Sequence, residues 1–445
     1  MSAPVLQPDL PRRLGVWDAA SIVVGIVIGG GIFVVPSIIA RHVPSTSGAM
    51  LIWVLGGIIT FFGALAYAEL GAMFPATGGQ YVFLREAYGP GMAFLCGWTI
   101  CGIVLPAMMA ALAVAFSAYL GHFIPLSPLA AKAASGGIIL LMTAINYSGV
   151  RLGAAVQNTC TILKLGGIAA IVISALWVPA VHATSAAEST PISWAPVAAA
   201  LTAVLLAYDG WNLMTAIGGE IRNPQRNVPL GLALGVGLIM AAYLSVNWAY
   251  LHVLPAAEIA ASERPGSLVA DRTLGSAGAA IISVTILVSI LGSINGGVLV
   301  MPRLVFAQAR DRLFFARLGE VHPRFRTPSA ATVAEGVWTA VLAISGSYEL
   351  LITYAVFCEF VFYLAVISAL MRLRHTQSER FRPYRMWGYP VTPLLFLAAA
   401  LWYVVASLLA SPKTSITALA LIAMGAVVYL VWRRSSQYSY LPKES

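Results

Sequence analysis

Residues 25–33 read Gly25-Ile-Val-Ile-Gly-Gly-Gly-Ile-Phe33 and lie within an apolar stretch long enough to cross a membrane. Three consecutive glycines lower the stability of a helix by about 3 kcal/mol relative to alanine. A helix that unwinds there leaves backbone N–H and C=O groups without partners. Inside a bilayer such groups are tolerated only where they line a cavity or meet a ligand. The stretch therefore predicts a broken membrane helix with a binding site at the break.

A second apolar stretch has a similar interruption, Leu206-Ala-Tyr-Asp-Gly-Trp-Asn212. It comes five spans after the first, so the second half of the chain would be inverted relative to the first half. Interrupted hydrophobic segments at matching positions of two halves are typical of inverted-repeat transporters. Taken alone, the glycine run would also suit close packing of two helices. The presence of both breaks favours the transporter interpretation.

The composition excludes a soluble protein. The 445 residues are 59% hydrophobic and 10% charged, whereas soluble domains carry about 25% charged residues. Six segments contain no Asp, Glu, Lys or Arg, and each is long enough for a span of about 20 residues: 42–68, 87–131, 165–187, 227–257, 273–302 and 386–412. We expect an all-α polytopic membrane protein with about twelve spans, near 16–40, 48–73, 89–120, 133–148, 156–178, 196–219, 229–253, 275–309, 329–346, 349–372, 391–410 and 414–432.

The basic residues are distributed unevenly between the two sides of these spans. Of the 26 Lys and Arg residues, 20 fall on the side of the N-terminus, Lys164 lies within a span, and five fall on the other side: Arg41, Lys132, Arg264, Arg272 and Lys413. The positive-inside rule then places both termini in the cytoplasm. Residues 1–14 have no apolar core of their own, so we expect no cleaved signal peptide. The predicted location is the cell (inner) membrane.

The whole chain, 1–445, is predicted to be one membrane transporter domain. Its parts would be a cytoplasmic N-terminus (1–15), a first repeat (16–178), an inverted second repeat (196–372), two additional helices (391–432) and a cytoplasmic C-terminus (433–445). The four cysteines, Cys96, Cys101, Cys160 and Cys358, all fall within spans. We therefore expect no structural disulfide and no disulfide-linked heavy subunit.

The two breaks present complementary backbone groups. The half-helix that begins near Gly31 offers N–H donors and a positive dipole end, which suit a carboxylate. The half-helices that end near Val27 and Leu206 offer carbonyl groups, which suit an ammonium. A zwitterion would satisfy both sets, and α-amino acids carry this head group.

Several motifs extend over nearly the whole chain. They are Gly25-x-x-Ile28-Gly-Gly-Gly-Ile-Phe33, Tyr67-Ala-Glu-Leu70 with Phe74-Pro75 and Gly78-Gly-Gln-Tyr81, Tyr208-x-Gly-Trp-Asn212, Glu220-x-x-Asn-Pro-x-Arg-Asn-x-Pro229, Tyr243-x-x-x-Asn247-x-Ala-Tyr250, and Gly292-Ser-x-Asn295-Gly with Arg303. In register, they resemble the amino acid–polyamine–organocation (APC) superfamily, closest to its L-type amino acid transporter branch of the prokaryotic type.

This resemblance implies a leucine-transporter-type fold, with five plus five helices in inverted repeat and two more. It implies that the N–H groups of Gly30 and Gly31 contact the substrate carboxylate. It also implies that the carbonyls of Val27, Leu206 and Asp209 contact the amine. The chain departs from the family pattern at Gly30, which is often serine, at Leu206, which is often an aromatic gate, and at Leu105, which is often arginine.

The predicted substrate-binding residues are Val27, Ile28, Gly29, Gly30, Gly31, Leu206, Tyr208, Asp209, Gly210 and Asn212. Trp211, Tyr243, Asn295 and Glu359 are predicted to act in gating or to support the site.

Lys164 is an ionisable residue within a span, and such residues are functional hypotheses by default. In the resemblance, a lysine at this place on the fifth helix replaces the sodium ion of sodium-coupled relatives. It could hold the first helix as a structural cation, serve as a proton-coupling site, or extend towards an interface.

Four acidic residues within the spans leave alternatives open. Asp209 could cap the half-helix that begins at Gly210, or face the substrate amine. Glu359 could be protonated and hydrogen-bonded, carry a transported proton, or favour cationic substrates. Glu69 is expected to pair with arginine at an inner gate, and Glu335 to cap or pair at its helix end.

These observations predict a sodium-independent secondary transporter of neutral L-amino acids that works by alternating access as an exchanger or uniporter. The alternatives are a proton-coupled or cationic amino acid or polyamine transporter and, in another class, a membrane amino-acid receptor. The six histidines are scattered and form no metal-binding pattern. We expect no enzyme activity, no metal, no cofactor and no nucleic-acid partner, only a small-molecule substrate and the lipid bilayer.

Overall fold

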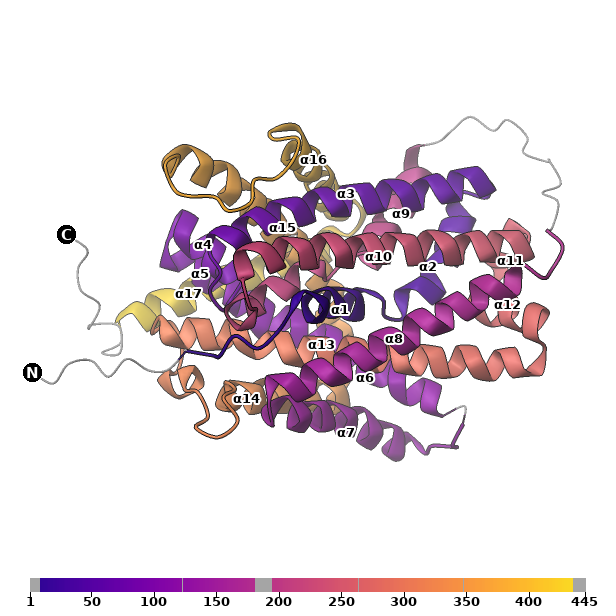
Figure 1. Ribbon diagram of the computed structural model, residues 1–445, viewed down its shortest axis with the longest axis horizontal. Coiled ribbons are helices and arrows are strands. Elements are labelled where there is room, and N and C mark those ends of the chain that lie inside the picture. Colours follow the sequence, from indigo (N-terminus) through magenta and orange to yellow (C-terminus); the bar gives the residue numbers. More distant parts are fainter. Residues whose placement is uncertain (1–8, 122, 181–193, 263, 347, 435–445) are drawn as a thin grey trace, which may run out of the picture.

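The computed structural model describes residues 9–121, 123–180, 194–262, 264–346 and 348–434, and the regular elements of these residues are all helices (Figure 1). The membrane-spanning segments are α1 (Val16–Val27) with α2 (Gly31–His42), α3 (Thr46–Met73), α5 (Pro90–Thr99) with π-helical η1 (Ile100–Val104) and α6 (Leu105–Leu120), α7 (Pro128–Tyr147), α8 (Val150–Ala175), α9 (Trp194–Ala207) with 3-10 helical η2 (Trp211–Glu220), α10 (Pro224–Val253), α13 (Ser276–Arg310), α14 (Ser329–Ser345), α15 (Tyr348–Thr376), α16 (Val391–Ala410) and α17 (Pro412–Arg434). Short helices between them are α4 (Gln80–Tyr88), α11 (Ala256–Ala261), α12 (Pro265–Leu274) and η3 (Ala316–Gly319).

The predicted all-α polytopic class is confirmed. Among the described residues, ten helices are long and apolar enough to cross a membrane, and α1 with α2 forms a further span that is bent by 50°. The shorter apolar helix α14 corresponds to the remaining predicted span. Each of the twelve predicted spans therefore matches one segment of the structure.

The two breaks lie side by side in the centre of the bundle. α1 ends at Val27 and α2 begins at Gly31, as the glycine run predicted. α9 ends at Ala207, and the chain then turns at Gly210, whose φ of 99° is in the left-handed region that favours glycine. A Cβ atom on Gly210 would approach the Ile26 side chain to 2.9 Å. Glycine is thus needed at position 210 both for the turn and for contact between the breaks.

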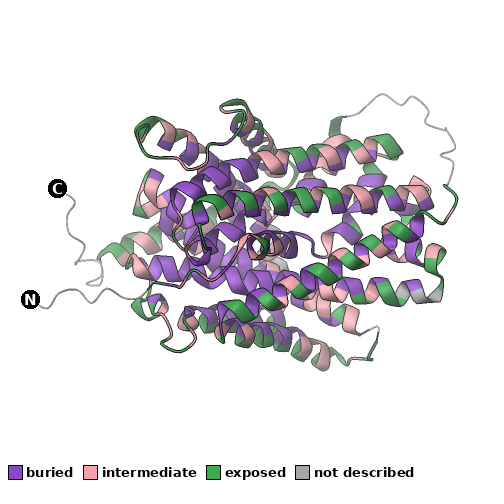
Figure 2. Cartoon of the chain, in the orientation of Figure 1, coloured by how far each residue is buried: buried purple, intermediate pink, exposed green. Residues whose placement is uncertain are grey.

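The core of the bundle surrounds α1. This helix packs against α10, α8, α13 and η2 and lies in the middle of Figure 1. Buried residues gather there, while exposed residues lie on the outward faces of the surrounding helices (Figure 2). Many of the exposed residues are large and apolar, such as Leu163, Ile173 and Leu409. Outward apolar faces are what a lipid-embedded bundle requires.

Both ends of the described chain, residues 9 and 434, lie at the same end of the bundle, on the left of Figure 1; we call this the terminal end. Polar contacts close it. The fully buried carboxylate of Glu69 accepts a hydrogen bond from Arg374 Nε at 2.9 Å, so the predicted pairing of Glu69 with an arginine is confirmed. Arg303 Nε donates to Glu220 Oε1 at 2.7 Å, and both side chains are completely buried.

A third closing contact at the terminal end involves α4. Asp311 Oδ2 accepts hydrogen bonds from Arg85 Nη1 at 2.6 Å and from the Tyr81 hydroxyl at 2.7 Å. Burial, and then the charge of Asp311, raise the pKa of Tyr81 well above its ordinary value. The Tyr81 hydroxyl therefore remains a donor at any physiological pH.

Candidate functional site

The first break presents free hydrogen-bond donors beside open space. Within the described residues, no acceptor is bound to the N–H groups of Gly30 and Gly31. A Cβ atom on Gly30 would meet no atom within 4 Å, whereas one on Gly31 would lie 3.8 Å from Ala207 Cα at the second break. N–H groups at the start of a helix, here α2, favour a carboxylate. This is where the sequence placed the substrate carboxylate.

The carbonyl groups of the first break are bound by the protein's own cation. The fully buried Lys164 Nζ lies 2.9 Å from the Gly25 carbonyl, 2.6 Å from that of Ile28 and 3.1 Å from that of Ser289 on α13. The Ser289 hydroxyl also donates to Ile28 O at 2.7 Å, and the Ser293 hydroxyl donates to Gly25 O at 2.8 Å. The Lys164 ammonium therefore sits among carbonyl oxygens of the kind that would otherwise suit a metal cation, and it does not extend towards an interface.

Tyr243 of α10 connects the two breaks. Its hydroxyl lies 3.0 Å from the carbonyl of Val27 and 2.9 Å from that of Ala207. The single hydroxyl proton can satisfy only one of these carbonyls at a time. The ring is held edge-on by Trp53, with centroids 5.3 Å apart, and packs against Tyr208 at 4.9 Å. Tyr243 thus ties the ends of α1 and α9 together.

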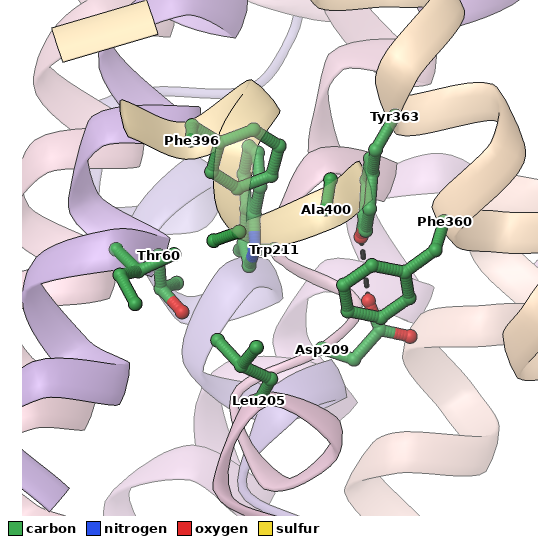
Figure 3. Close-up of a pocket in the computed structure, with 10 residues that line it drawn as sticks. Thr60, Leu205, Asp209, Trp211, Phe360, Tyr363, Phe396 and Ala400 are labelled. Atoms are coloured by element: carbon green, nitrogen blue, oxygen red, sulfur yellow. Dashed lines mark hydrogen bonds between the residues drawn. The ribbon is translucent and has the colours of Figure 1, made fainter. Parts of the chain in front are cut away.

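At the second break, the side chain of Asp209 does not cap a helix. The residue that precedes η2 is Gly210, and no side chain caps this helix. Instead, Asp209 Oδ1 accepts a hydrogen bond from the Tyr363 hydroxyl of α15 at 2.6 Å (Figure 3). The predicted capping role is therefore wrong, because the left-handed turn at Gly210 directs the carboxylate towards α15. The second half-helix also begins at Trp211 rather than Gly210, and is 3-10 rather than α-helical.

The backbone carbonyls of the second break are only partly occupied. The Leu206 carbonyl accepts a hydrogen bond from the Asp209 N–H at 3.2 Å. The Asp209 carbonyl has no donor among the described residues. Leu206 itself is 42% exposed.

A small pocket lies behind the second break, lined by Ile59, Thr60, Leu205, Asp209, Trp211, Phe360, Tyr363, Phe396, Ala399 and Ala400 (Figure 3). Its volume of about 10 Å³ is sufficient for roughly one water molecule. No residue of the glycine break lines it, so this pocket is separate from the predicted carboxylate site.

A buried polar network joins the second break to α3, α4 and α15. Asn212 Nδ2 donates to Glu359 Oε1 at 2.8 Å and to Gln80 Oε1 at 3.2 Å. Gln80 Oε1 also accepts from the Tyr67 hydroxyl at 2.9 Å. The Tyr363 hydroxyl lies 3.0 Å from Asn212 Oδ1. Asn212 therefore uses its whole amide to hold other side chains of the protein.

The remaining predicted residues contact other parts of the protein around the two breaks. The Tyr208 hydroxyl donates to the Trp53 carbonyl at a long 3.3 Å. Trp211 stacks on Tyr363 with ring centroids 5.5 Å apart. Asn295 reaches neither break, since its amide donates to Gly153 O at 3.0 Å and Gln157 Oε1 at 2.8 Å on α8. Gly29 faces α13, where a Cβ atom would lie 3.2 Å from Ser293 Oγ.

Sequence reasoning missed four contributors: Ser289, Ser293, Gln80 and Tyr363. Ser289 and Ser293 are four residues apart and hence on one face of α13, beside Gly292 and Gly296. A polar, small-residue face in an otherwise apolar span could have indicated them. Gln80 belongs to the motif Gly78-Gly-Gln-Tyr81, but its role could not be predicted because its partner Asn212 is 132 residues away in the sequence. Tyr363 carried no local signal, since Asp209 is 154 residues away.

The described residues include no group of His, Cys, Asp and Glu side chains that could hold a metal ion. The four cysteines are buried, with free thiols.

Comparison with known proteins gives the site its context. The serine/threonine exchanger SteT of Bacillus subtilis (strain 168) is 36% identical over 394 residues, which cover 88% of this chain and 90% of SteT. The human b(0,+)-type amino acid transporter 1 is 32% identical over 413 residues, 91% of this chain and 84% of the relative. The human large neutral amino acids transporter small subunit 2 is 30% identical over 438 residues, 95% of this chain and 80% of the relative.

Residues 14–432 match the family described as amino acid permease. This range includes both helix breaks, Lys164 and the twelve spans except for the last two residues of α17. The chain therefore belongs to the amino acid permease family.

Proposed function

We propose that this protein is a sodium-independent exchanger of neutral L-amino acids that works by alternating access. The observation that carries the proposal is the arrangement at the first break. There, Lys164 Nζ binds three backbone carbonyls, while the N–H groups of Gly30 and Gly31 remain free beside open space. The Lys164 ammonium occupies the position of a coupling metal ion, and the free N–H groups can bind a carboxylate. The relative SteT, which is named as a serine/threonine exchanger, supports the exchange mode.

In this proposal the amino acid head group lies between the two breaks. Its carboxylate would bind the N–H groups of Gly30 and Gly31. Its ammonium would bind the Asp209 carbonyl, which has no donor among the described residues, and the Leu206 and Val27 carbonyls. The Val27 carbonyl already receives bonds from Gly29 N–H and the Tyr243 hydroxyl, so we expect it to contribute least.

The side-chain preference is proposed to be neutral. The Asp209 carboxylate accepts from Tyr363 and lines the pocket behind the break rather than the space beside Gly30. A cationic substrate would lack an acidic partner beside the head group. Two relatives carry names that refer to neutral side chains: serine and threonine for SteT, and large neutral amino acids for the human small subunit 2.

The setting is proposed to be the cell (inner) membrane, with both termini in the cytoplasm. The terminal end would then be the cytoplasmic end, as the uneven Lys and Arg distribution predicts. One relative is named as a small subunit. We propose that this chain works without a disulfide-linked heavy subunit, because its four cysteines are buried within the bundle and offer no thiol to a partner.

The test is exchange in proteoliposomes made with the purified protein. Vesicles are loaded with unlabelled serine, threonine, leucine or no amino acid, and uptake of labelled amino acid is followed in sodium or choline chloride. We expect uptake only into loaded vesicles, at the same rate in both salts. Equal uptake into empty vesicles would show that the protein is a uniporter and not an exchanger. A requirement for sodium would contradict the role given to Lys164.

A further inference from the structure

Glu359 is a buried acid that the proposed function does not use. It lies in the middle of α15 with only 3% of its surface exposed. Oε1 accepts one hydrogen bond, from the neutral amide of Asn212. Oε2 is buried and has no partner among the described residues. A carboxylate in this position would have only the neutral amides of Asn212 and Gln80 beside it, and one of its oxygens has no bound donor among the described residues.

Among the described residues, no cationic side chain forms a hydrogen bond with Glu359. The titratable groups that face it are Asp209 at the second break, Tyr67 on α3, Cys96 on α5, and Cys358 and Tyr363 on its own helix, and none of them is a base. Arg372, the nearest arginine further along α15, is 13 residues away, about 20 Å along a helix. The next, Arg374, is bound to Glu69. Lys164 is bound to carbonyl groups at the first break.

An unpaired carboxylate away from water is strongly disfavoured, so the group takes up a proton instead. In the arrangement that the structure shows, Glu359 is therefore the neutral acid. The same reasoning would hold for any buried acid. What distinguishes Glu359 is its connection to the second break.

Glu359 and Asp209 are linked through two neutral side chains. Asn212 donates to Glu359 Oε1 at 2.8 Å. The Tyr363 hydroxyl lies 3.0 Å from Asn212 Oδ1 and donates to Asp209 Oδ1 at 2.6 Å. Asp209 and Asn212 belong to the broken helix, whereas Glu359 and Tyr363 belong to α15. Any movement of the break relative to α15 therefore changes the hydrogen bonds and the negative charge that Glu359 experiences.

We propose that the carboxyl group of Glu359 is a proton-binding site linked to the transport cycle. The proton comes from bulk water and returns to it, and Glu359 alternates between the neutral acid and the carboxylate as the second break moves. A proton and a conformation that influence each other's stability are thermodynamically linked. This inference rests on the proposed amino acid exchange and adds a proton to that cycle.

The first experiment needs no variant. Amino acid is added to the purified protein in weakly buffered solution containing a pH-sensitive dye, and exchange in proteoliposomes is measured from about pH 5 to about pH 9, with equal pH on both sides. We expect net proton uptake or release on substrate addition, and an exchange rate that depends on pH. A protein that exchanges amino acids with no proton signal and a flat profile would overturn the inference.

The second experiment assigns the site. Glu359→Gln keeps the shape and is always neutral, so exchange should persist with a flat pH profile and without the proton signal. Glu335→Gln is the matched control, because Glu335 is also buried with an unpartnered Oε2 but lies on α14, apart from both breaks. This lack of a partner corrects the expectation that Glu335 caps or pairs. The control should retain the wild-type profile.

The outcomes are separable. A wild-type profile in Glu359→Gln, or the same change in both variants, would overturn the assignment to Glu359. If Glu359→Gln fails to fold, Tyr363→Phe breaks the link to Asp209 and should shift the midpoint of the wild-type pH profile; an unchanged midpoint counts against the site. Absence of exchange by the wild type at every pH would instead refute the proposed function.

Discussion

The two helix breaks differ in how their charges are balanced. At the first break, the Lys164 ammonium is surrounded by three carbonyl oxygens and two serine hydroxyls from α13 support the same carbonyls. Near the second break, Asp209 accepts a hydrogen bond from Tyr363 and Glu359 accepts one from Asn212. Both donors are neutral. At the first break, the carbonyl groups are hydrogen-bonded to a cation, and only the N–H groups of Gly30 and Gly31 are free among the described residues. At the second break, the two acids have no cation bound to them. We infer that the first break fixes the substrate head group and the second responds during the cycle.

The largest effect is expected at the glycines of the first break. Gly30→Val should reduce exchange by more than about 100-fold, equivalent to about 2.7 kcal/mol, because its side chain would enter the open space beside the free N–H groups. Gly31→Val should do the same, because a Cβ at this position already lies in van der Waals contact with Ala207 Cα, at 3.8 Å, and the two methyl groups of valine would extend further into the space between the breaks. Binding and exchange of labelled amino acid would be measured together.

The control for the glycine variants is Gly166→Val on α8, since a Cβ at this exposed glycine also meets no neighbouring atom. It should exchange normally. Full exchange by both Gly30→Val and Gly31→Val would show that the carboxylate binds elsewhere.

Removal of the Lys164 ammonium should slow transport much more than it weakens substrate binding. Lys164→Ala removes the charged donor shared by three buried carbonyls, and Ile28 O and Gly25 O keep only the hydroxyls of Ser289 and Ser293. A hydrogen bond to a charged group contributes about 1.5–3 kcal/mol, so exchange should fall by roughly 10- to 100-fold. Substrate should still bind within about threefold, because the head-group contacts at Gly30 and Gly31 remain. Lys132→Ala, at an exposed position on α7, is the control. Equal loss of binding and exchange would place Lys164 within the binding site itself.

The Tyr243 hydroxyl, which links the two breaks, can be removed by a single substitution. Tyr243→Phe removes the donor shared by Val27 O and Ala207 O, and a buried hydrogen bond contributes about 1–1.5 kcal/mol. Exchange should therefore drop by about tenfold. Tyr208→Phe removes only a long 3.3 Å bond to Trp53 and should change exchange by less than about twofold. Equal effects in the two variants would mean that ring packing, and not the bridge, is what matters.

A smaller effect is expected from the charge of the second break. Asp209→Asn retains an oxygen that can accept from Tyr363, so exchange should stay within about threefold of wild type. The ranking of neutral and cationic amino acids in competition assays should not change. A switch of preference towards acidic or away from cationic substrates would place the Asp209 carboxylate in contact with the substrate.

No effect is expected from sodium. Replacement of sodium by choline should leave the exchange rate unchanged, because Lys164 Nζ occupies the carbonyl groups that a sodium ion would need. The comparison is made in the same vesicle preparation at constant ionic strength. Sodium dependence in Lys164→Ala alone would strengthen this reading of the first break.

The sequence determined more about the first break than about the second. The glycine run predicted both the end of α1 at Val27 and the start of α2 at Gly31, since helix propensity is a local property. The direction of the Asp209 side chain could not be predicted, because it depends on the φ of Gly210 and on Tyr363, 154 residues away.

The partner of Glu359 was hidden in the same way. Asn212 lies 147 residues from it in the sequence, and a single sequence does not reveal such pairs. The spans, by contrast, follow from runs of apolar residues that each predict their own helix. The predicted roles of the site residues remain predictions until the variants are measured.

The backbone contacts at the terminal end reduce the number of independent movements available to the bundle. The N–H groups of Arg13 and Leu14 donate to the Glu220 carbonyl at 2.8 and 3.0 Å, and the Arg222 N–H donates to Leu14 O at 2.8 Å. These three hydrogen bonds join the segment that leads into α1 to the end of η2. We therefore expect α1 and η2 to move together: α1 cannot move away from η2 without breaking these three hydrogen bonds.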